Sequence, residues 1–193
     1  MSLFSNLLYR LKRLVGLRGN RVYLAGPDVF FEDAPEHFAR LQKMCAERGL
    51  VGVVPSDGGL SKGLAGTGPE IAHRIYLANI DLIRSCDAVL ANLMPFRNHT
   101  EPDSGTVFEV GFGIALGKPV YGYLPGAHEH YEDKIKSYFG CQMKGDLPFC
   151  ERYGFLIESF QQPLNLMLSR STPLYQEAVY ALDDLAKNLL QPA

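Results

Sequence analysis

The sequence lacks any marked excess of charge of one sign. It carries 19 Lys and Arg residues against 21 Asp and Glu residues, which gives a formal net charge of -2 and a pI near 6.2. A nucleic-acid polymer is a dense polyanion, so binding it normally needs a concentrated basic face. The charge balance therefore argues against DNA or RNA as a partner.

Cysteine is scarce, and its spacing excludes two common roles. The four residues Cys45, Cys86, Cys141 and Cys150 show neither the close pairing of a zinc site nor the dense framework of a small secreted domain. With 193 residues and 47% hydrophobic content, the chain can bury a core without disulfides or a structural metal. The spacing allows a bridge between Cys141 and Cys150, but no secretory signal is recognisable. We therefore expect reduced thiols and a cytoplasmic location.

Residues 1–20 contain no acidic residue and combine Arg and Lys with Leu and Val at helical spacing. This pattern predicts a basic amphipathic extension that is too short and too charged to span a bilayer. Three roles stay open: binding to a membrane surface, an organelle presequence, or packing on its own domain or another subunit. The last is the commonest use of an apolar helix stripe, so a membrane partner is not expected.

Apolar runs and helical patterns alternate over residues 21–193, which we interpret as a single domain. Strands are predicted over 21–25, 50–54, 87–93 and 119–124, and helices over 35–48, 69–85 and 106–116. Residues 56–68 are rich in glycine and predict a mobile loop, residues 126–150 read as irregular, 155–160 as an edge strand and 174–190 as a terminal helix.

The alternation predicts the fold class α/β, with a doubly wound, flavodoxin- or Rossmann-like parallel sheet of about five strands and helices on both faces. Ligands in this architecture bind beyond the carboxyl ends of the strands. The loops after Ala25, Val54 and Leu93 are therefore candidates for a site.

One carboxylate, Glu109, is the only charged side chain between Asp103 and Lys118. Burial disfavours an ionised acid by several kcal/mol, so such a residue usually has a partner or a task. Ser104, Gly105 and Thr106 suit a helix start, which would place Glu109 in or near the first turn, where the helix dipole favours negative charge. We interpret Glu109 as a nucleophile.

Two further carboxylates, Asp81 and Asp103, could converge on the same pocket. Asp103 precedes the helix of Glu109, and Asp81 lies late in the preceding predicted helix. Glycosidic chemistry uses one carboxylate to attack the anomeric carbon and another acid to assist the leaving group. The alternative for Asp81 and Asp103 is helix capping or surface solvation.

Six ordered motifs between about residues 21 and 168 carry a more specific signal. They are Val22-Tyr-Leu-Ala-Gly-Pro27, Asn79-Ile-Asp81, Cys86-Asp-Ala-Val89, Pro95-Phe-Arg97, Glu101-Pro-Asp-Ser-Gly-Thr-Val-Phe-Glu-Val-Gly111 and Pro163-Leu-Asn-Leu-Met167. Together they resemble the nucleoside 2-deoxyribosyltransferase family. The resemblance implies an enzyme that exchanges nucleobases on 2′-deoxyribonucleosides without a cofactor, through a covalent sugar ester on Glu109, with retention of configuration and ping-pong kinetics.

The resemblance also implies roles for other residues. Tyr23 would orient the Glu109 carboxylate, and Asp81 and Asp103 would contact the base and manage its proton. Asn165 would reach the sugar 5′-hydroxyl of a neighbouring subunit, so a homo-oligomer is implied. The partners are then small nucleosides, free bases and further copies of the chain.

Further substrate contacts are expected from position alone. Gly26 and Phe30 lie in the loop after the first strand, where Phe30 or its neighbour Phe31 could stack on a base or belong to the core. Asp57 follows the second strand. Gly105 and Gly113 lie four residues from Glu109, and Gly113 would allow close approach of a ligand or of the sheet.

Competing functions remain open at this level. Water could cleave the same sugar ester, which gives a hydrolase of deoxynucleosides or deoxynucleoside 5′-monophosphates; a non-catalytic nucleoside sensor is a further alternative. The segment from Ser104 to Glu109 partly resembles the signature of the phosphoribohydrolase group, but the Pro-Gly-Gly that precedes this signature is missing. His128 and His130 have no nearby cysteine or carboxylate pattern to complete a site, so no metal is predicted.

Overall fold

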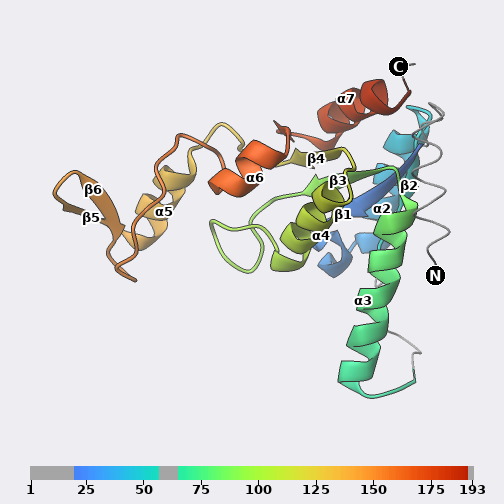
Figure 1. The fold of residues 1–193 in the computed structure, drawn as a ribbon, viewed down its shortest axis with the longest axis horizontal. Helices are drawn as coiled ribbons and strands as arrows, with labels where there is room; N and C mark the ends of the chain where they lie inside the picture. Colours follow the sequence, from blue (N-terminus) through green and yellow to red (C-terminus); the bar gives the residue numbers. More distant parts are fainter. Residues whose placement is uncertain (1–19, 57–64, 191–193) are drawn as a thin grey trace.

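A five-stranded parallel sheet forms the centre of the molecule. The computed structural model of the chain describes residues 20–56 and 65–190 (Figure 1). The strand order is β2-β1-β3-β4-β7, and every neighbouring pair is parallel. The bounds are β1 (Arg21–Ala25), β2 (Val51–Val53), β3 (Ala88–Asn92), β4 (Val120–Tyr123) and β7 (Leu174–Tyr175). The predicted flavodoxin-like fold class is confirmed.

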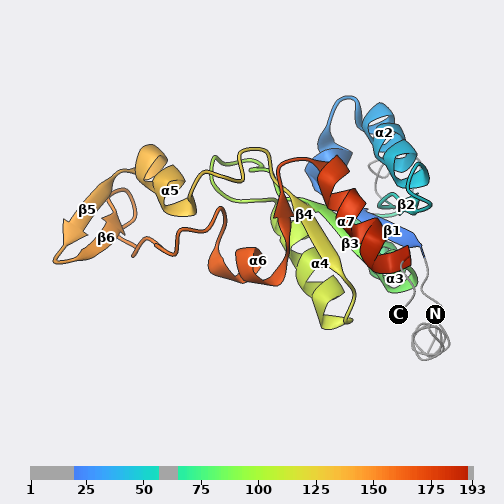
Figure 2. The same cartoon turned by 90° about the horizontal axis from the view of Figure 1, so that it is seen from above.

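Helices cover both faces of the sheet (Figure 2). Alternate β1 residues face opposite sides, because side chains of a strand alternate. Val22 and Leu24 pack in a core with α2 (Ala34–Ala46) and α7 (Ala178–Leu190). Tyr23 and Ala25 pack in a second core, with residues of α3 (Gly68–Ser85), α4 (Ser104–Ala115) and α6 (Leu166–Ser171). A buried strand of this kind is apolar on both faces, which explains its continuous hydrophobic run.

Local signals placed most of these elements within a few residues. Gly49, which directly follows the helix predicted over 35–48, has a φ of 70°, the left-handed conformation that glycine adopts without steric cost. At the start of α3, Thr67 and Glu70 form a capping box, with the Thr67 backbone N–H donating to Glu70 Oε2 at 2.8 Å. The Thr67 backbone and hydroxyl donors lower the pKa of the exposed Glu70.

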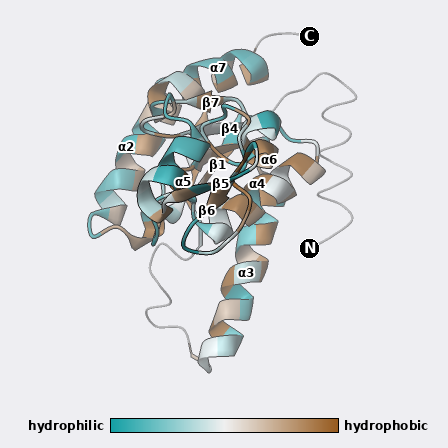
Figure 3. Ribbon diagram, turned by 90° about the vertical axis from the view of Figure 1, so that its left-hand side faces the viewer, coloured by the Kyte–Doolittle hydropathy of each residue, from teal (hydrophilic) through white to brown (hydrophobic). Residues whose placement is uncertain are grey.

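The prediction of an irregular segment over residues 126–150 is wrong. This segment contains α5 (Tyr131–Phe139) and an antiparallel hairpin of β5 (Cys141–Lys144) and β6 (Leu147–Cys150). We call residues 126–163 the accessory lobe, which extends away from the sheet in Figure 1. Figure 3 shows α5 mainly in hydrophilic colours and α4 mainly in white to brown. A short hairpin with mixed polarity gives little periodic signal, which explains the error.

Two predictions for the C-terminal part are also wrong. Residues 155–160 form no strand; only Leu156 makes an isolated bridge, to Phe149. The edge strand is β7, which pairs with β4, so the last helix begins at Ala178 instead of residue 174. A two-residue strand cannot be separated from a helix start by periodicity, because only its pairing with β4 defines it.

Some predictions fall outside the described part of the chain. They concern the basic extension, of which only residue 20 is described, and most of the glycine-rich loop, including Asp57. Across residues 20–56 and 65–190, no helix combines the length and apolar character needed to cross a membrane.

Candidate active site

A cavity of about 310 Å³ opens at the carboxyl ends of β1, β2 and β3. The chain order reverses between β1 and β3, which is the position where open α/β sheets place their ligands. All three loops expected to contribute do so, through Gly26, Pro55 and Arg97. The complete lining is Gly26, Val29, Phe30, Pro55, Asn79, Arg97, Asp103, Ser104, Gly105, Thr106 and Glu109.

The carboxylate of Glu109 lines this cavity and accepts a hydrogen bond from a buried tyrosine. Tyr23 Oη donates to Glu109 Oε1 at 2.6 Å, from a side chain that is 0% exposed. Glu109 is half-buried and is the sixth residue of α4. Glu109 therefore lies in the second turn of α4. The helix dipole stabilises a negative charge less strongly there than in the first turn. The tyrosine hydroxyl fixes the position of one carboxylate oxygen.

Asp103 combines helix capping with a place in the cavity lining. Its Oδ2 accepts from the Thr106 backbone N–H at 2.9 Å and from Thr106 Oγ1 at 3.2 Å. The cap begins α4 at Ser104 and so sets the position of Glu109 along the helix. Both interpretations of Asp103, capping and contact with a ligand, are compatible with this geometry.

An aromatic and cationic cluster forms another wall of the cavity. The rings of Phe30 and Phe96 are stacked with centroids 5.3 Å apart. The Arg97 guanidinium lies 4.7 Å from the Phe30 centroid and 4.6 Å from that of Phe96. Arg97 has a φ of 61°, which is costly for a residue with a side chain. Phe30, 42% exposed, is thus available to a ligand and is not a core residue.

A buried polar network supports the turn that carries Gly26. Asp28, 1% exposed, accepts from Asn92 Nδ2 at 3.0 Å and from Tyr123 Oη at 3.4 Å. Burial, and then the charge of Asp28, raise the pKa of the Tyr123 phenol. A Cβ at Gly26 would lie 1.9 Å from Asp28 Oδ2 and 2.8 Å from Asn92 Cβ. Only glycine fits at this part of the cavity wall.

The predicted convergence of Asp81 on the cavity is not observed. Asp81 Oδ1 pairs with Arg84 Nη1 at 3.4 Å, and Asp81 does not belong to the lining. Asn79, two residues earlier in α3, lines the cavity instead, and its Oδ1 accepts from the Ser56 N–H and Oγ at 2.8 and 2.7 Å. Each helical residue turns the side-chain direction by about 100°, so residues two apart face different sides.

The remaining predicted residues fall in three different places. Gly105 lines the cavity, and a Cβ there would lie 2.9 Å from Asp103 Oδ2. Gly113 does not: a Cβ on it would meet Val89 Cγ2 at 3.0 Å, so Gly113 serves close packing of α4 on the sheet. Asn165 caps α6 and borders a separate, mainly apolar hollow of about 520 Å³ between α4 and α6.

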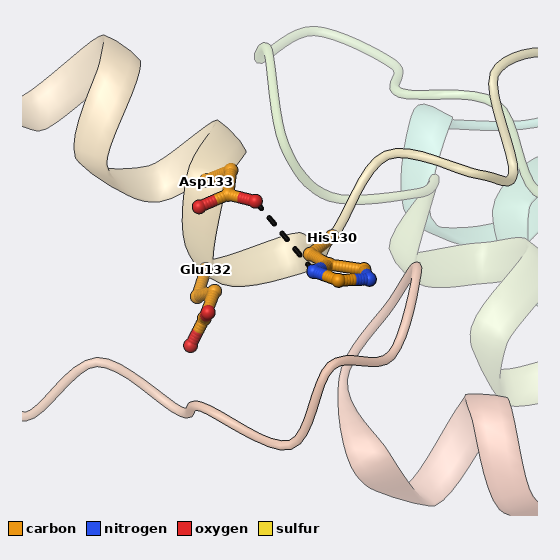
Figure 4. Close-up of side chains that lie close together, drawn as sticks. All are labelled: His130, Glu132 and Asp133. Atoms are coloured by element: carbon orange, nitrogen blue, oxygen red, sulfur yellow. Dashed lines mark ion pairs between the residues drawn. The ribbon is translucent and has the colours of Figure 1, made fainter.

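One group of possible metal ligands occurs in the described residues, at the start of α5 (Figure 4). No cysteine or carboxylate pattern that completes a site with His130 was expected from the sequence, yet ligand atoms of Glu132 and Asp133 lie within 4.8 Å of His130 and of each other. Figure 4 shows Glu132 pointing away from the other two side chains. The helix dipole favours acids in a first turn, and Glu132 Oε1 lies 3.9 Å from Lys136 Nζ. These features account for the group, and we assign no metal.

Sequence reasoning overlooked Asn79 and Arg97 as members of the site. Both stood within quoted motifs, Asn79-Ile-Asp81 and Pro95-Phe-Arg97. Helical phase could have separated Asn79 from Asp81, because Ile80 and Ile83 mark the buried face of α3. Arg97 carries no such signal, since its left-handed backbone conformation is visible only in the structure.

The fold and the cavity define a class of α/β proteins with a carboxylate at the switch point of the sheet. The family model for nucleoside 2-deoxyribosyltransferase matches residues 22–167, and the chain belongs to this family.

Three relatives illustrate the range of similarity. An uncharacterized protein of Schizosaccharomyces pombe is 36% identical over 119 residues, a match that covers 61% of this chain and 55% of that protein, so the chain spans about half that relative. The 2-desoxiribosyltransferase of Leishmania mexicana is similar in structure, with a TM-score of 0.66 and 29% identity over 89% of this chain and 99% of that one. A conserved protein of Enterococcus faecalis, at 16% identity and TM-score 0.57 over the same shares, shows the fold alone.

Proposed function

We propose that the protein transfers the 2-deoxyribosyl group between nucleobases of 2′-deoxyribonucleosides. The observation that carries the proposal is the Tyr23–Glu109 hydrogen bond of 2.6 Å at the wall of a solvent-connected cavity. A carboxylate held by a phenol and facing a cavity is suited to attack a sugar carbon. Membership of the family and the likeness to the Leishmania mexicana enzyme support the same chemistry.

In the proposed reaction, Glu109 attacks C1′ of the donor nucleoside and the bond from C1′ to the base nitrogen breaks. The electron pair of that bond leaves with the base, which needs a proton to depart as a neutral molecule. Asp103 is our candidate for handling this proton, since it caps the helix that carries Glu109 and lines the same cavity. The nitrogen of a second base then attacks C1′ and gives up its proton, which returns to Asp103, and Glu109 departs as a carboxylate.

Phe30, Arg97 and Asn79 are our candidates for binding the base. The exposed Phe30 ring offers a stacking surface, and base–aromatic stacking contributes roughly 1–3 kcal/mol per base. We place Asn79, and not Asp81, in the group that faces the substrate, because only Asn79 lines the cavity.

A homo-oligomer remains part of the proposal through Asn165. This side chain is absent from the lining of the Glu109 cavity of its own chain. Its region carries exposed apolar residues that suit an interface, among them Ile114 and Met167, of which Met167 is 71% exposed. Pairing of these faces between copies would place Asn165 near a neighbouring site.

A second candidate, hydrolysis of deoxynucleoside 5′-monophosphates, is favoured by one specific observation. Arg97, Ser104 and the start of α4 line the cavity, and these are groups that bind phosphate. Asn165, the residue suited to a free 5′-hydroxyl, lies elsewhere in the single chain.

The deciding experiment incubates the protein with deoxyinosine and adenine, and separately with deoxynucleoside 5′-monophosphates in water. Formation of deoxyadenosine together with hypoxanthine supports transfer. Release of hypoxanthine without deoxyadenosine rejects transfer, and release of base only from the monophosphates supports the second candidate. Binding of deoxyinosine without turnover of any substrate would indicate a sensor.

A further inference from the structure

The four cysteines fall into two chemically different pairs. Cys45 and Cys86 are each 0% exposed, and burial raises the pKa of both thiols to about 11. Thiols that hardly ionise react slowly with disulfides, because the thiolate is the nucleophile. Cys141 is partly exposed and Cys150 is 6% exposed, and both lie in the accessory lobe.

Cys141 and Cys150 stand directly opposite each other in the β5–β6 hairpin. The antiparallel register pairs Cys141 with Cys150, Gln142 with Phe149 and so on to the turn. The sequence separation alone, nine positions, did not establish this arrangement. It arises because the chain reverses at Gly145, with a φ of 63°, and Asp146.

The two cysteines occupy the kind of position in which opposite side chains approach most closely. The Cys150 N–H donates away from β5, to the Phe155 carbonyl at 2.8 Å, and the next residue, Glu151, donates to the Gly140 carbonyl at 3.3 Å. Cys141 and Cys150 are therefore a pair without mutual backbone hydrogen bonds. Such pairs have Cα atoms about 4.5 Å apart, within the roughly 4.4–6.8 Å that disulfides span.

We infer that Cys141 and Cys150 form a thiol–disulfide modification site that reacts with low-molecular-weight disulfides. In the first step the Cys141 thiolate attacks a sulfur of oxidised glutathione, which releases one glutathione thiolate and leaves a mixed disulfide on Cys141. The Cys150 thiolate then attacks the Cys141 sulfur and releases the second glutathione. Both cysteine protons pass to the solvent and the released thiolates, and the two electrons lost by the protein reduce glutathione disulfide to two thiols.

The link would close the open end of the hairpin, opposite its turn. Cys150 lines a hollow of about 420 Å³ in the lobe, together with Glu101 and Tyr131, and Tyr131 Oη donates to Glu101 Oε1. Glu101 lies two residues before Asp103, so the site of modification is close in the fold to the loop that enters α4. The inference does not depend on the proposed catalytic function.

The test treats the full chain with oxidised glutathione, blocks remaining thiols with iodoacetamide and measures the intact mass and the tryptic map. Trypsin cleaves after Lys144 and Arg152 and so separates Cys141 from Cys150. We expect one peptide pair joined through Cys141 and Cys150, a loss of two hydrogen atoms in mass, and alkylation of Cys45 and Cys86 only after unfolding. Reduced glutathione should restore both lobe thiols.

Matched variants separate the internal link from other reactions. Cys141→Ser should abolish the joined peptides, and Cys150→Ser should stop the reaction at a stable mixed disulfide on Cys141. A wild-type chain that keeps glutathione on Cys141, forms dimers through Cys141, or leaves both lobe thiols open to iodoacetamide would overturn the inference. Because these outcomes are read on the wild-type chain, they stay decisive even if a variant folds poorly.

Discussion

The hydroxyl of Tyr23, at the centre of strand β1, donates a hydrogen bond of 2.6 Å to the carboxylate of Glu109 in helix α4. The two residues are 86 positions apart in the chain. They meet because β1 turns Tyr23 toward the face of the sheet that α4 covers. The proposed nucleophile is thereby tied to the most buried part of the fold.

The first prediction concerns Glu109 itself. Glu109→Gln keeps the shape of the side chain and removes its nucleophilic charge, so we expect base exchange to fall by at least roughly 10³-fold with the fold intact. Activity assays and circular dichroism would measure the two effects. Mass spectrometry of the wild-type protein with donor nucleoside alone should reveal a sugar adduct on Glu109. Turnover by the variant near the wild-type rate would remove Glu109 from the mechanism.

A second prediction isolates the hydrogen bond from Tyr23. Tyr23→Phe keeps the buried ring and deletes the donor to a charged acceptor, a bond that contributes about 1.5–3 kcal/mol. If this contribution is realised in the transition state, kcat should fall roughly 10- to 150-fold. An unchanged kcat would mean that the tyrosine acts only in packing.

The third prediction compares two residues of helix α3. Asn79→Ala should lower kcat/KM by about tenfold or more, since it removes a cavity-lining amide and the hydrogen bonds to Ser56. Asp81→Asn should leave kcat/KM within about threefold, because Asp81 pairs with Arg84 at a partly exposed position, where ion pairs contribute little. The reverse order of effects would show that the assembled protein places Asp81 in the site.

Replacement of Arg97 by glycine should separate activity from stability. The variant loses two cation–π contacts, each contributing about 0.5–1 kcal/mol. It also relieves a left-handed conformation that costs a residue with a side chain about 1–2 kcal/mol. We expect the free energy of unfolding to change by less than about 1 kcal/mol, from the difference between these effects. KM should rise about tenfold, by analogy with the loss of one charge-assisted contact.

Comparison of substrates for the same variant distinguishes the two candidate functions. A rise in KM for deoxynucleoside monophosphates alone would support phosphate binding by Arg97. A rise for nucleosides as well would support contact with the base. Unchanged KM values for both substrate classes would exclude Arg97 from binding.

A fifth prediction follows from the buried Lys118. The residue is 5% exposed, and its ammonium group donates to the carbonyls of Arg84 and Cys86 at the end of α3. Burial lowers the pKa of Lys118 from 10.5. At pH values between the lowered pKa and 10.5 the unfolded chain binds more protons, so the free energy of unfolding rises with pH in this window. At pH values below this window, the burial of charged Lys118 lowers the free energy of unfolding by its full amount.

The variant Lys118→Met lacks this titration. The difference in unfolding free energy between wild type and variant should therefore increase in favour of the wild type as pH rises toward 10.5. Tyrosines with raised pKa values, such as Tyr175 at about 12, are present in both proteins and cancel in the comparison. Denaturant titrations at several alkaline pH values would measure the effect, and a difference that is constant with pH would contradict it.

The sequence by itself determined the sheet and the neighbourhood of the proposed nucleophile. Alternating apolar runs and helix patterns suffice to predict a parallel sheet with its loops at one edge, because burial on both faces leaves no other arrangement for such strands. Glu109 was identifiable because burying a lone ionised carboxylate among apolar residues and glycines costs free energy, so that such a residue usually has a binding partner or a functional role. The turn and cap residues placed the start of α4 within two positions.

Tertiary structure alone decided which polar side chains meet. Helical phase distinguishes Asn79 from Asp81, but only the packing of α3 into the core through Ile83 shows which of the two reaches the cavity. Cys141 and Cys150 oppose each other only because the hairpin register aligns them. Arg97 stacks on the Phe30 ring from a left-handed backbone conformation. These relationships depend on strand pairing and on contacts between separate elements, and the free energies of such contacts are not encoded in local periodicity.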